Sequence, residues 1–151
     1  MGINVVGVVG AGQMGAGIAQ VAAQAGLSVI VSDVADAALD KGKASIASSL
    51  ARLVKKESLT QADADAVLGR VRFTTSTADH AGADFIIEAA TENESLKRKI
   101  FADLDKVARP EVILASNTSS ISITRLAAST SRPERFVGMH FMNPVPVMKL
   151  V

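Results

Sequence analysis

Residues 3–15 read INVVGVVGAGQMG, a β-branched apolar run that leads directly into glycines at positions 10, 12 and 15. Glycines with this Gly-x-Gly-x-x-Gly spacing, between a strand and a helix, are typical of a loop that binds a dinucleotide. The first glycine permits a tight turn, the second lets the backbone approach a pyrophosphate, and the third lets the helix pack on the strand. Free N–H groups at the helix start supply the anion site. The loop residues expected at a cofactor are Gly10, Ala11, Gly12, Gln13, Met14 and Gly15.

Short apolar, β-branched runs alternate with helical patterns along the rest of the chain. The runs predicted as strands are 3–9, 27–31, 71–74, 85–87, 112–114 and 136–139. Two helices are predicted over residues 13–25 and about 36–56. A short third helix begins at a capping pattern at Thr60, and a fourth begins at a capping pattern at Thr91 and ends at Arg109-Pro110. A fifth helix is expected near Ile121. In the helix after Thr91, the buried side is expected to comprise Leu96, Ile100, Leu104 and Val107.

The strands are almost continuously apolar, which fits strands that are covered on both faces of a sheet. Strands that alternate with helices through short connections predict right-handed crossovers. The sequence therefore predicts one α/β domain over residues 1–151, of Rossmann type, with a doubly wound and mostly parallel sheet.

The composition excludes several classes of protein. Sixteen Lys and Arg against fifteen Asp and Glu give a net charge of +1, which favours neither nucleic acid nor an anionic membrane as a partner. Cysteine is absent, which excludes a disulfide framework and thiolate metal sites, and no metal site is expected. No apolar stretch approaches the roughly 20 residues of a membrane helix, and no secretory signal is found, so a cytoplasmic protein is expected.

Asp33 stands at the end of the second predicted strand, near the spacing at which an acid binds the adenosine ribose hydroxyls. A turn, or a cap for the next helix, would also explain an Asp at this position. Because the glycine loop precedes it, we predict the ribose role. A carboxylate there repels a 2′-phosphate, so the predicted cofactor is NAD rather than NADP.

A polar cluster, ASNTSS, follows the fifth predicted strand and contains Asn117 and Ser119. Open α/β sheets bind ligands beyond the carboxyl ends of their strands, so both side chains are expected at the functional edge. Simple helix capping would also explain the serines. One of Ser119 and Ser120 is expected to cap the next helix, which leaves the other free for a ligand.

His140 follows the last predicted strand, and Asn143 comes three residues later. A lone His is more often a surface or core residue than a catalyst. Here, however, Ser119, His140 and Asn143 are all expected at the edge of the sheet that carries the glycine loop. A shared catalytic site is therefore predicted at this edge.

Four stretches, GAGQMGAGIAQ, EAATENESLKRKIF, ASNTSSISIT and GMHFMNPVPVMKLV, together resemble the NAD-binding domain of the 3-hydroxyacyl-CoA dehydrogenases. The resemblance spans the whole chain and is greatest to the bacterial 3-hydroxybutyryl-CoA type. It implies NAD as the cofactor and an acyl-CoA substrate. The implied reaction is oxidation of (S)-3-hydroxyacyl-CoA, in particular 3-hydroxybutyryl-CoA, to 3-ketoacyl-CoA, as in fatty acid and butanoate metabolism.

The resemblance also assigns roles to residues of the last two stretches. His140 is similar to the general base that removes the proton of the 3-hydroxyl group while hydride leaves for the nicotinamide. Ser119 is similar to the residue that hydrogen-bonds the same oxygen, so both are candidate catalytic residues. Asn143 is similar to a residue that contacts the cofactor near the nicotinamide, and Asn117 is expected to help shape that pocket.

Residues of two helices complete the implied site. Glu92 and Lys97 match family positions around the cofactor, although a solvated first helical turn would explain them almost equally well. Ser49, Arg52 and Lys56 share one face of the long helix. The resemblance implies that Ser49 and Lys56 contact coenzyme A, whereas a basic helical face is usually only a solvated one.

The resemblance implies structure beyond residue 151. In the family, the MKLV run is followed by a Glu that orients the catalytic His, and by a helical domain that completes the acyl pocket and the dimer interface. A homodimer of the full-length protein is therefore expected. Residues 1–151 alone are expected to bind NAD but to turn over slowly or not at all, since without that Glu nothing would fix the tautomer of the His140 imidazole.

Three alternatives remain open. The same domain occurs inside multifunctional fatty-acid oxidation proteins, although a strand that starts at Ile3 argues against an upstream partner. β-Hydroxyacid dehydrogenases act on free acids and share a related glycine loop, but they depend on a catalytic lysine in their second domain. A stand-alone NAD-sensing module would bind the dinucleotide without redox chemistry.

Overall fold

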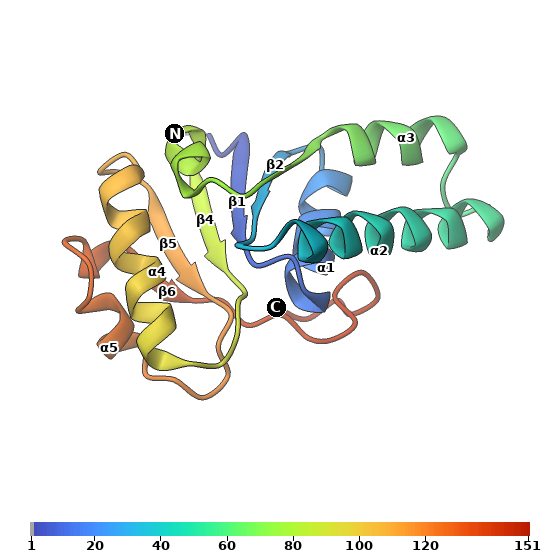
Figure 1. The fold of residues 1–151 in the computed structure, drawn as a ribbon. Helices are drawn as coiled ribbons and strands as arrows, with labels where there is room; N and C mark the ends of the chain where they lie inside the picture. Colours follow the sequence, from blue (N-terminus) through green and yellow to red (C-terminus); the bar gives the residue numbers. More distant parts are fainter. Residues whose placement is uncertain (1) are drawn as a thin grey trace.

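The computed structural model describes residues 2–151 and has a six-stranded sheet at its centre (Figure 1). All neighbouring strands pair in parallel, in the order β3-β2-β1-β4-β5-β6. The strands are β1 (Val5–Val9), β2 (Ser28–Ser32), β3 (Val71–Thr74), β4 (Phe85–Glu88), β5 (Ile113–Ser116) and β6 (Phe136–Gly138). The prediction of a doubly wound parallel sheet is confirmed.

Helices cover the sheet in two groups (Figure 1). The helices are α1 (Gln13–Gln24), α2 (Asp36–Lys55), α3 (Gln61–Gly69), α4 (Glu94–Val107) and α5 (Ile123–Ala127), with short 3-10 turns η1 (Thr77–Gly82) and η2 (Pro133–Arg135). One apolar cluster joins α1, α2 and α3 to the sheet, and a second joins α4 and α5 to it. None of the helices in residues 2–151 is both long enough and apolar enough to cross a bilayer.

The first strand begins two residues later than its apolar run predicts. The backbone N–H groups of Asn4 and Val5 both donate to the Asp84 carboxylate, at 2.9 Å each, at the amino-terminal edge of the sheet. Asp84 also accepts a bond from Arg109 at 2.6 Å. The Asn4 amide bond, followed by the Arg109 and Val5 bonds, lowers the pKa of Asp84 to about 2. The Asp84 carboxylate therefore satisfies backbone N–H groups at the edge of the sheet opposite the glycine loop.

Of the two predicted capping patterns, one is confirmed and the other is wrong. Thr60 caps α3 by accepting a bond from the Asp63 N–H at 3.1 Å. The cap of α4 is Asn93 rather than Thr91, because the Asn93 carboxamide accepts a bond from the Leu96 N–H at 3.0 Å. The helix therefore starts later than predicted.

The buried face of α4 also differs from the prediction. Its buried side chains are Lys97, Phe101 and Leu104, of which only Leu104 was expected. Phe101 packs edge-on against Phe136 of β6, with ring centroids 4.5 Å apart. The expected pair Leu96 and Ile100 instead lines an open cleft at the carboxyl ends of the strands. Leu96 is exposed and Ile100 is partly buried against the core, so this apolar stripe lies at the boundary between the core and a surface hollow.

Candidate active site

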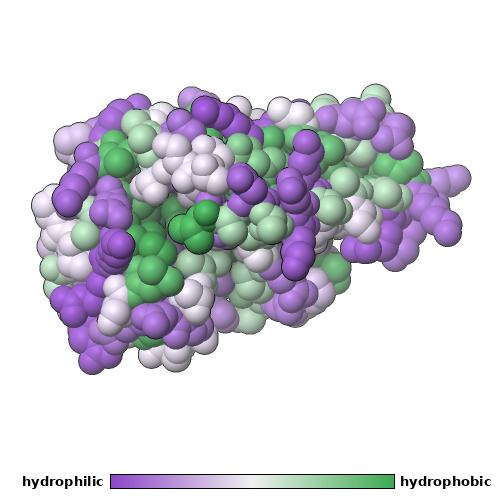
Figure 2. All heavy atoms as spheres, in the orientation of Figure 1, coloured by the Kyte–Doolittle hydropathy of each residue, from purple (hydrophilic) through white to green (hydrophobic). Residues whose placement is uncertain are grey.

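The main cleft lies at the carboxyl ends of β1, β2 and β4 and has a volume of about 670 Å³. Over α4, in the left half of Figure 2, apolar side chains gather in a hollow. Its lining comprises Val9, Gly10, Gly12, Gln13, Met14, Ser32, Asp33, Val34, Thr75, Thr77, Ala89, Ala90, Thr91, Leu96, Lys99, Ile100, Asp103 and Leu104. Five predicted cofactor residues, four from the glycine loop and Asp33 directly after β2, therefore share one cleft.

The glycine loop has the geometry that an anion cradle requires. Gly10 has a φ of +105°, and a Cβ there would lie 2.6 Å from the Ala89 carbonyl oxygen. At Gly15 a Cβ would lie 1.8 Å from the Gly10 carbonyl oxygen, so α1 approaches the loop closely only because residue 15 is glycine. Gly12 is different, since a Cβ there would meet nothing within 4 Å. Its side of the loop is open.

No side chain of residues 2–151 caps the start of α1, where Gly12 is the N-cap residue. The first N–H groups of a helix have no partner inside the helix, and they carry partial positive charge. An uncapped helix start beside an open glycine is suited to a phosphate group. The residues present therefore fit the pyrophosphate of a dinucleotide.

Asp33 lies directly beside the glycine loop. One of its carboxylate oxygens accepts a bond from the Ala11 N–H at 2.9 Å, and the other accepts a longer bond from the Ala35 N–H at 3.4 Å. The N-cap residue of α2 is Ala35, with no side-chain cap, so Asp33 does not cap that helix. Its carboxylate lines the cleft, where a ribose hydroxyl could donate to it.

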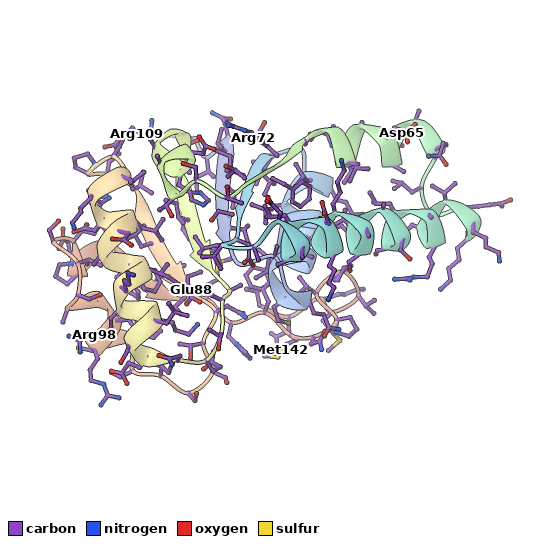
Figure 3. All side chains as sticks on the ribbon, in the orientation of Figure 1. Asp65, Arg72, Glu88, Arg98, Arg109 and Met142 are labelled. Carbon is purple, nitrogen blue, oxygen red and sulfur yellow. The ribbon has the colours of Figure 1, made fainter. Side chains whose placement is uncertain are left out.

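A buried charged cluster lies between the ends of β4 and β5 and the first turn of α4, at the Glu88 label in Figure 3. Lys97 is 1% exposed and Glu88 is fully buried, and the Lys97 Nζ lies 2.6 Å from a Glu88 carboxylate oxygen. Glu88 also accepts bonds from the Ala90 N–H and from the Ser116 hydroxyl, both at 2.7 Å. The alternative interpretation, that Lys97 belongs to a solvated first helical turn, is therefore wrong.

Glu92 continues this cluster toward solvent. Its carboxylate accepts bonds from the hydroxyls of Thr118 at 2.8 Å and Ser120 at 3.1 Å, and it lies 3.6 Å from the Lys97 Nζ. Burial by itself would raise the pKa of Glu92, but the Thr118 bond, the Lys97 charge and the Ser120 bond together lower it. Glu92 is therefore ionised at neutral pH, and it ties the loop after β4 to the loop after β5.

Asn117 contacts two successive residues: its backbone carbonyl contacts His140, and its side chain contacts Phe141. The His140 Nδ1 lies 2.8 Å from the Asn117 carbonyl oxygen, and the Phe141 N–H donates to the Asn117 side-chain oxygen at 2.8 Å. A carbonyl oxygen only accepts, so Nδ1 carries the proton of the neutral ring and Nε2 keeps a free lone pair. The expectation that nothing within residues 1–151 would fix this tautomer is therefore wrong.

The expected capping role of Ser119 or Ser120 is also wrong. The helix after this loop starts at Ile123, and its cap is Ser122, whose hydroxyl accepts a bond from the Arg125 N–H at 3.3 Å. The Ser120 hydroxyl is used by Glu92 instead. Ser119 is exposed, and its hydroxyl makes no hydrogen bond within residues 2–151. The side chain of Ser119 therefore remains available to a ligand.

A smaller cavity of about 130 Å³ lies between α1, α2 and the segment after His140. Asn143, Ser49 and Arg52 line it, whereas Lys56 follows the end of α2 and does not. Gln13 lines both this cavity and the main cleft. The segment that carries Asn143 thus lies beside the start of α1, so the last predicted cluster is close to the first.

The structure places the predicted residues at one edge of the sheet without enclosing all of them in one cavity. Ser119, His140 and Asn143 do not line the main cleft. Backbone hydrogen bonds hold the segments after the neighbouring strands together at this edge, since the Asn117 N–H donates to the Glu88 carbonyl at the end of β4 and the Met139 N–H donates to the Ser116 carbonyl at the end of β5. The imidazole and the glycine loop therefore lie on the same edge.

Sequence reasoning missed three residues of this edge, which are Glu88, Ser116 and Thr118. Each lies at or just after the end of a buried strand and is itself buried. One signal was present for Glu88, a carboxylate that directly follows the apolar run 85–87. A charged residue in that position needs a buried partner, and the partner is Lys97.

Comparison with known proteins gives a consistent result. The family model described as "3-hydroxyacyl-CoA dehydrogenase, NAD binding domain" matches residues 5–151. A probable 3-hydroxybutyryl-CoA dehydrogenase of Deinococcus radiodurans is 54% identical over 145 residues, which are 96% of this chain and 52% of that protein. The 3-hydroxybutyryl-CoA dehydrogenase of Bradyrhizobium diazoefficiens is 54% identical over 149 residues, 99% of this chain and 51% of that protein.

Solved structures agree in fold over the same region. The crystal structure of (S)-3-hydroxybutyryl-CoA dehydrogenase PaaH1 from Ralstonia eutropha superimposes with a TM-score of 0.95 at 58% identity. The match covers 97% of this chain and 52% of that one. The chain thus spans about half the length of the curated relatives it matches.

Proposed function

The chain belongs to the family of NAD-binding domains of the 3-hydroxyacyl-CoA dehydrogenases, and on that basis we propose that it is the cofactor-binding half of such an enzyme. The proposed reaction is the oxidation of (S)-3-hydroxybutyryl-CoA to the 3-ketoacyl-CoA, with NAD as the hydride acceptor. The observation that carries the proposal is the His140 imidazole, which has a free Nε2 on the same sheet edge as an open glycine loop.

NAD is bound, in this proposal, along the carboxyl edge of the sheet. The loop Gly10–Gly15 and the start of α1 hold the pyrophosphate, and Asp33 accepts bonds from the adenosine ribose. Leu96 and Ile100 offer an apolar wall on α4. Glu92, Lys97, Asn117, Ser119 and Asn143 are the proposed contacts of the remaining half of the cofactor.

The chain's own chemistry is a proton transfer at one oxygen. The Nε2 lone pair of His140 takes the proton of the 3-hydroxyl group, and the Asn117 carbonyl holds the Nδ1–H so that the ring keeps its orientation. Ser119 donates a hydrogen bond to the same substrate oxygen. NAD supplies the site that accepts the hydride from C3 of the substrate.

The rest of the enzyme is proposed from the family. A helical domain after residue 151 would complete the acyl pocket and form a homodimer in the cytoplasm, with Ser49 and Lys56 at the coenzyme A. The Asn117 carbonyl already fixes the neutral tautomer of His140. The role left for a Glu of that region would be to stabilise the protonated form of the ring. Residues 1–151 alone should therefore bind NAD and turn over slowly.

The test is NADH production from racemic 3-hydroxybutyryl-CoA by the complete protein that carries this domain. We expect turnover with one enantiomer, and its loss by at least a hundredfold in His140→Gln with NAD affinity retained. Turnover of the free acid in preference to the thioester would favour the β-hydroxyacid class. NAD binding without turnover of either would favour a sensing module.

A further inference from the structure

The charged cluster contains one more acidic residue than basic ones. Lys97 lies between Glu88 at 2.6 Å and Glu92 at 3.6 Å. Glu88 is fully buried, Lys97 is 1% exposed, and the Glu92 side chain is 51% exposed. Two carboxylates and one ammonium group give the cluster a net charge of −1.

The distances show how this charge is distributed. Removing a charge from water is costly unless a partner and hydrogen bonds replace the water, and Glu88 has both. Its two oxygens accept bonds from Ser116, Ala90 and Lys97. Glu88 and Lys97 therefore form a neutral buried pair, and the excess negative charge resides on the more exposed Glu92.

The cluster lies on the side of the cleft where the second half of a dinucleotide must extend. Asp33 lies beyond β2 and the glycine loop beyond β1, so in the proposed function the adenosine and pyrophosphate would lie on that side of the strand order. In the part of the chain that the structure describes, the strands on the other side of β1 are β4, β5 and β6. Glu88 ends β4 and Ser116 ends β5, so the cluster is at the nicotinamide side.

We propose that Glu88 is a positioning residue that neutralises Lys97 and leaves the charge of Glu92 for the cofactor, which shifts the relative affinity of the site toward NAD+ over NADH. This proposal rests on the proposed function. The nicotinamide ring of NAD+ carries a positive charge, and the ring of NADH does not, whereas their ADP-ribose halves are identical. A charge of −1 near the ring therefore favours the oxidised form.

Without Glu88 the same residues would pair differently. Lys97 would have only Glu92 as a counter-charge, and the net charge of the cluster would fall from −1 to 0. Glu88→Gln makes this change with little change of shape. The Gln carbonyl oxygen still accepts from Ala90 and Lys97, and its NH₂ donates to the Ser116 hydroxyl.

The experiment measures dissociation constants of the chain for NAD+, NADH and ADP-ribose by calorimetry. In Glu88→Gln we expect the preference for NAD+, measured as the dissociation constant of NADH divided by that of NAD+, to fall about tenfold, which is 1.4 kcal/mol. Affinity for ADP-ribose should change less than twofold. Ser116→Ala, which removes a hydrogen bond of Glu88 but no charge, is the matched control and should keep the preference of the unmodified chain.

A double variant separates charge from shape. Glu88→Gln with Lys97→Met removes one charge of each sign and returns the cluster to −1, so the preference for NAD+ should be restored even if overall affinity falls. Equal losses for all three ligands in Glu88→Gln, or no restoration in the double variant, would overturn the proposal. If the unmodified chain bound none of the ligands, the proposed function itself would fail.

Discussion

Because of His80, the free energy of unfolding of this domain should depend on pH between about 4 and 6.5, above the range in which the carboxylates titrate. Its ring is completely buried on η1, with Nε2 2.7 Å from the Ser32 hydroxyl and Nδ1 without a partner in residues 2–151. The ring lies against Gly7 of β1, where a Cβ would meet Nδ1 at 2.5 Å. Burial, opposed only in part by the Asp79 charge, lowers the pKa of His80 from 6.5 to about 4.

The sign of the effect follows from the protons bound in each state. Between pH 6.5 and 4 the unfolded chain binds a proton at His80 and the folded chain does not, so the free energy of unfolding falls as the pH falls. Each unit of pKa difference is worth 1.36 kcal/mol, so the whole window is worth about 3 kcal/mol. At pH 5, about 2 kcal/mol of this is lost relative to pH 7.5.

Urea unfolding at pH 7.5 and pH 5.0 measures this difference directly. His80→Gln keeps an amide donor for Ser32 but does not titrate, so its free energy of unfolding should change by less than about 1 kcal/mol between the two pH values. Ser32→Ala is the matched control, because it weakens the contact but leaves the buried ring to titrate. Equal pH dependence of the unmodified chain and His80→Gln would refute the reasoning.

Gly12→Ala should leave the free energy of unfolding within about 1 kcal/mol, since its Cβ meets nothing within 4 Å, yet weaken NAD binding at least tenfold by calorimetry. Arg132 is buried and donates hydrogen bonds to the Asp105 carboxylate and to four backbone carbonyls, three of them near the end of α4. Arg132→Ala should therefore lower the free energy of unfolding, measured in urea, by about 3–5 kcal/mol. The control Arg135→Ala, at an exposed residue, should lower it by less than about 1 kcal/mol. Asp33→Asn should weaken NAD binding and raise the ratio of NADP to NAD affinity about tenfold, and unchanged selectivity would contradict the ribose role of Asp33.

The alternation of strands and helices was predictable because it is recorded in local patterns. Six apolar runs gave six strands, and the glycine spacing identified the loop whose Gly10 and Gly15 have no room for a side chain. Periodicity along one segment is sufficient for such features, since each depends on neighbours within a few residues. The choice of carboxyl edge for the site follows from the parallel topology alone.

Capping and helix faces were predicted less well. Ser119, Ser120 and Ser122 all satisfy the local preference for a cap, and only the path of the loop after β5 selects Ser122. Likewise the apolar residues Leu96 and Ile100 fit a core face, and only the position of α4 beside the cleft leaves them at its wall. Here several local solutions have similar free energies, and packing decides among them.

The amino-acid sequence by itself determined the order of the elements, the glycine turn and the edge of the sheet that carries the candidate site. Only the tertiary structure decided that Lys97 is buried against Glu88, that His80 is neutral in the core and that the Asn117 carbonyl holds His140. The physical reason is that the free energy of a charge or an imidazole depends on the groups around it in space. For His80 and His140 those groups are 48 and 23 residues away along the chain.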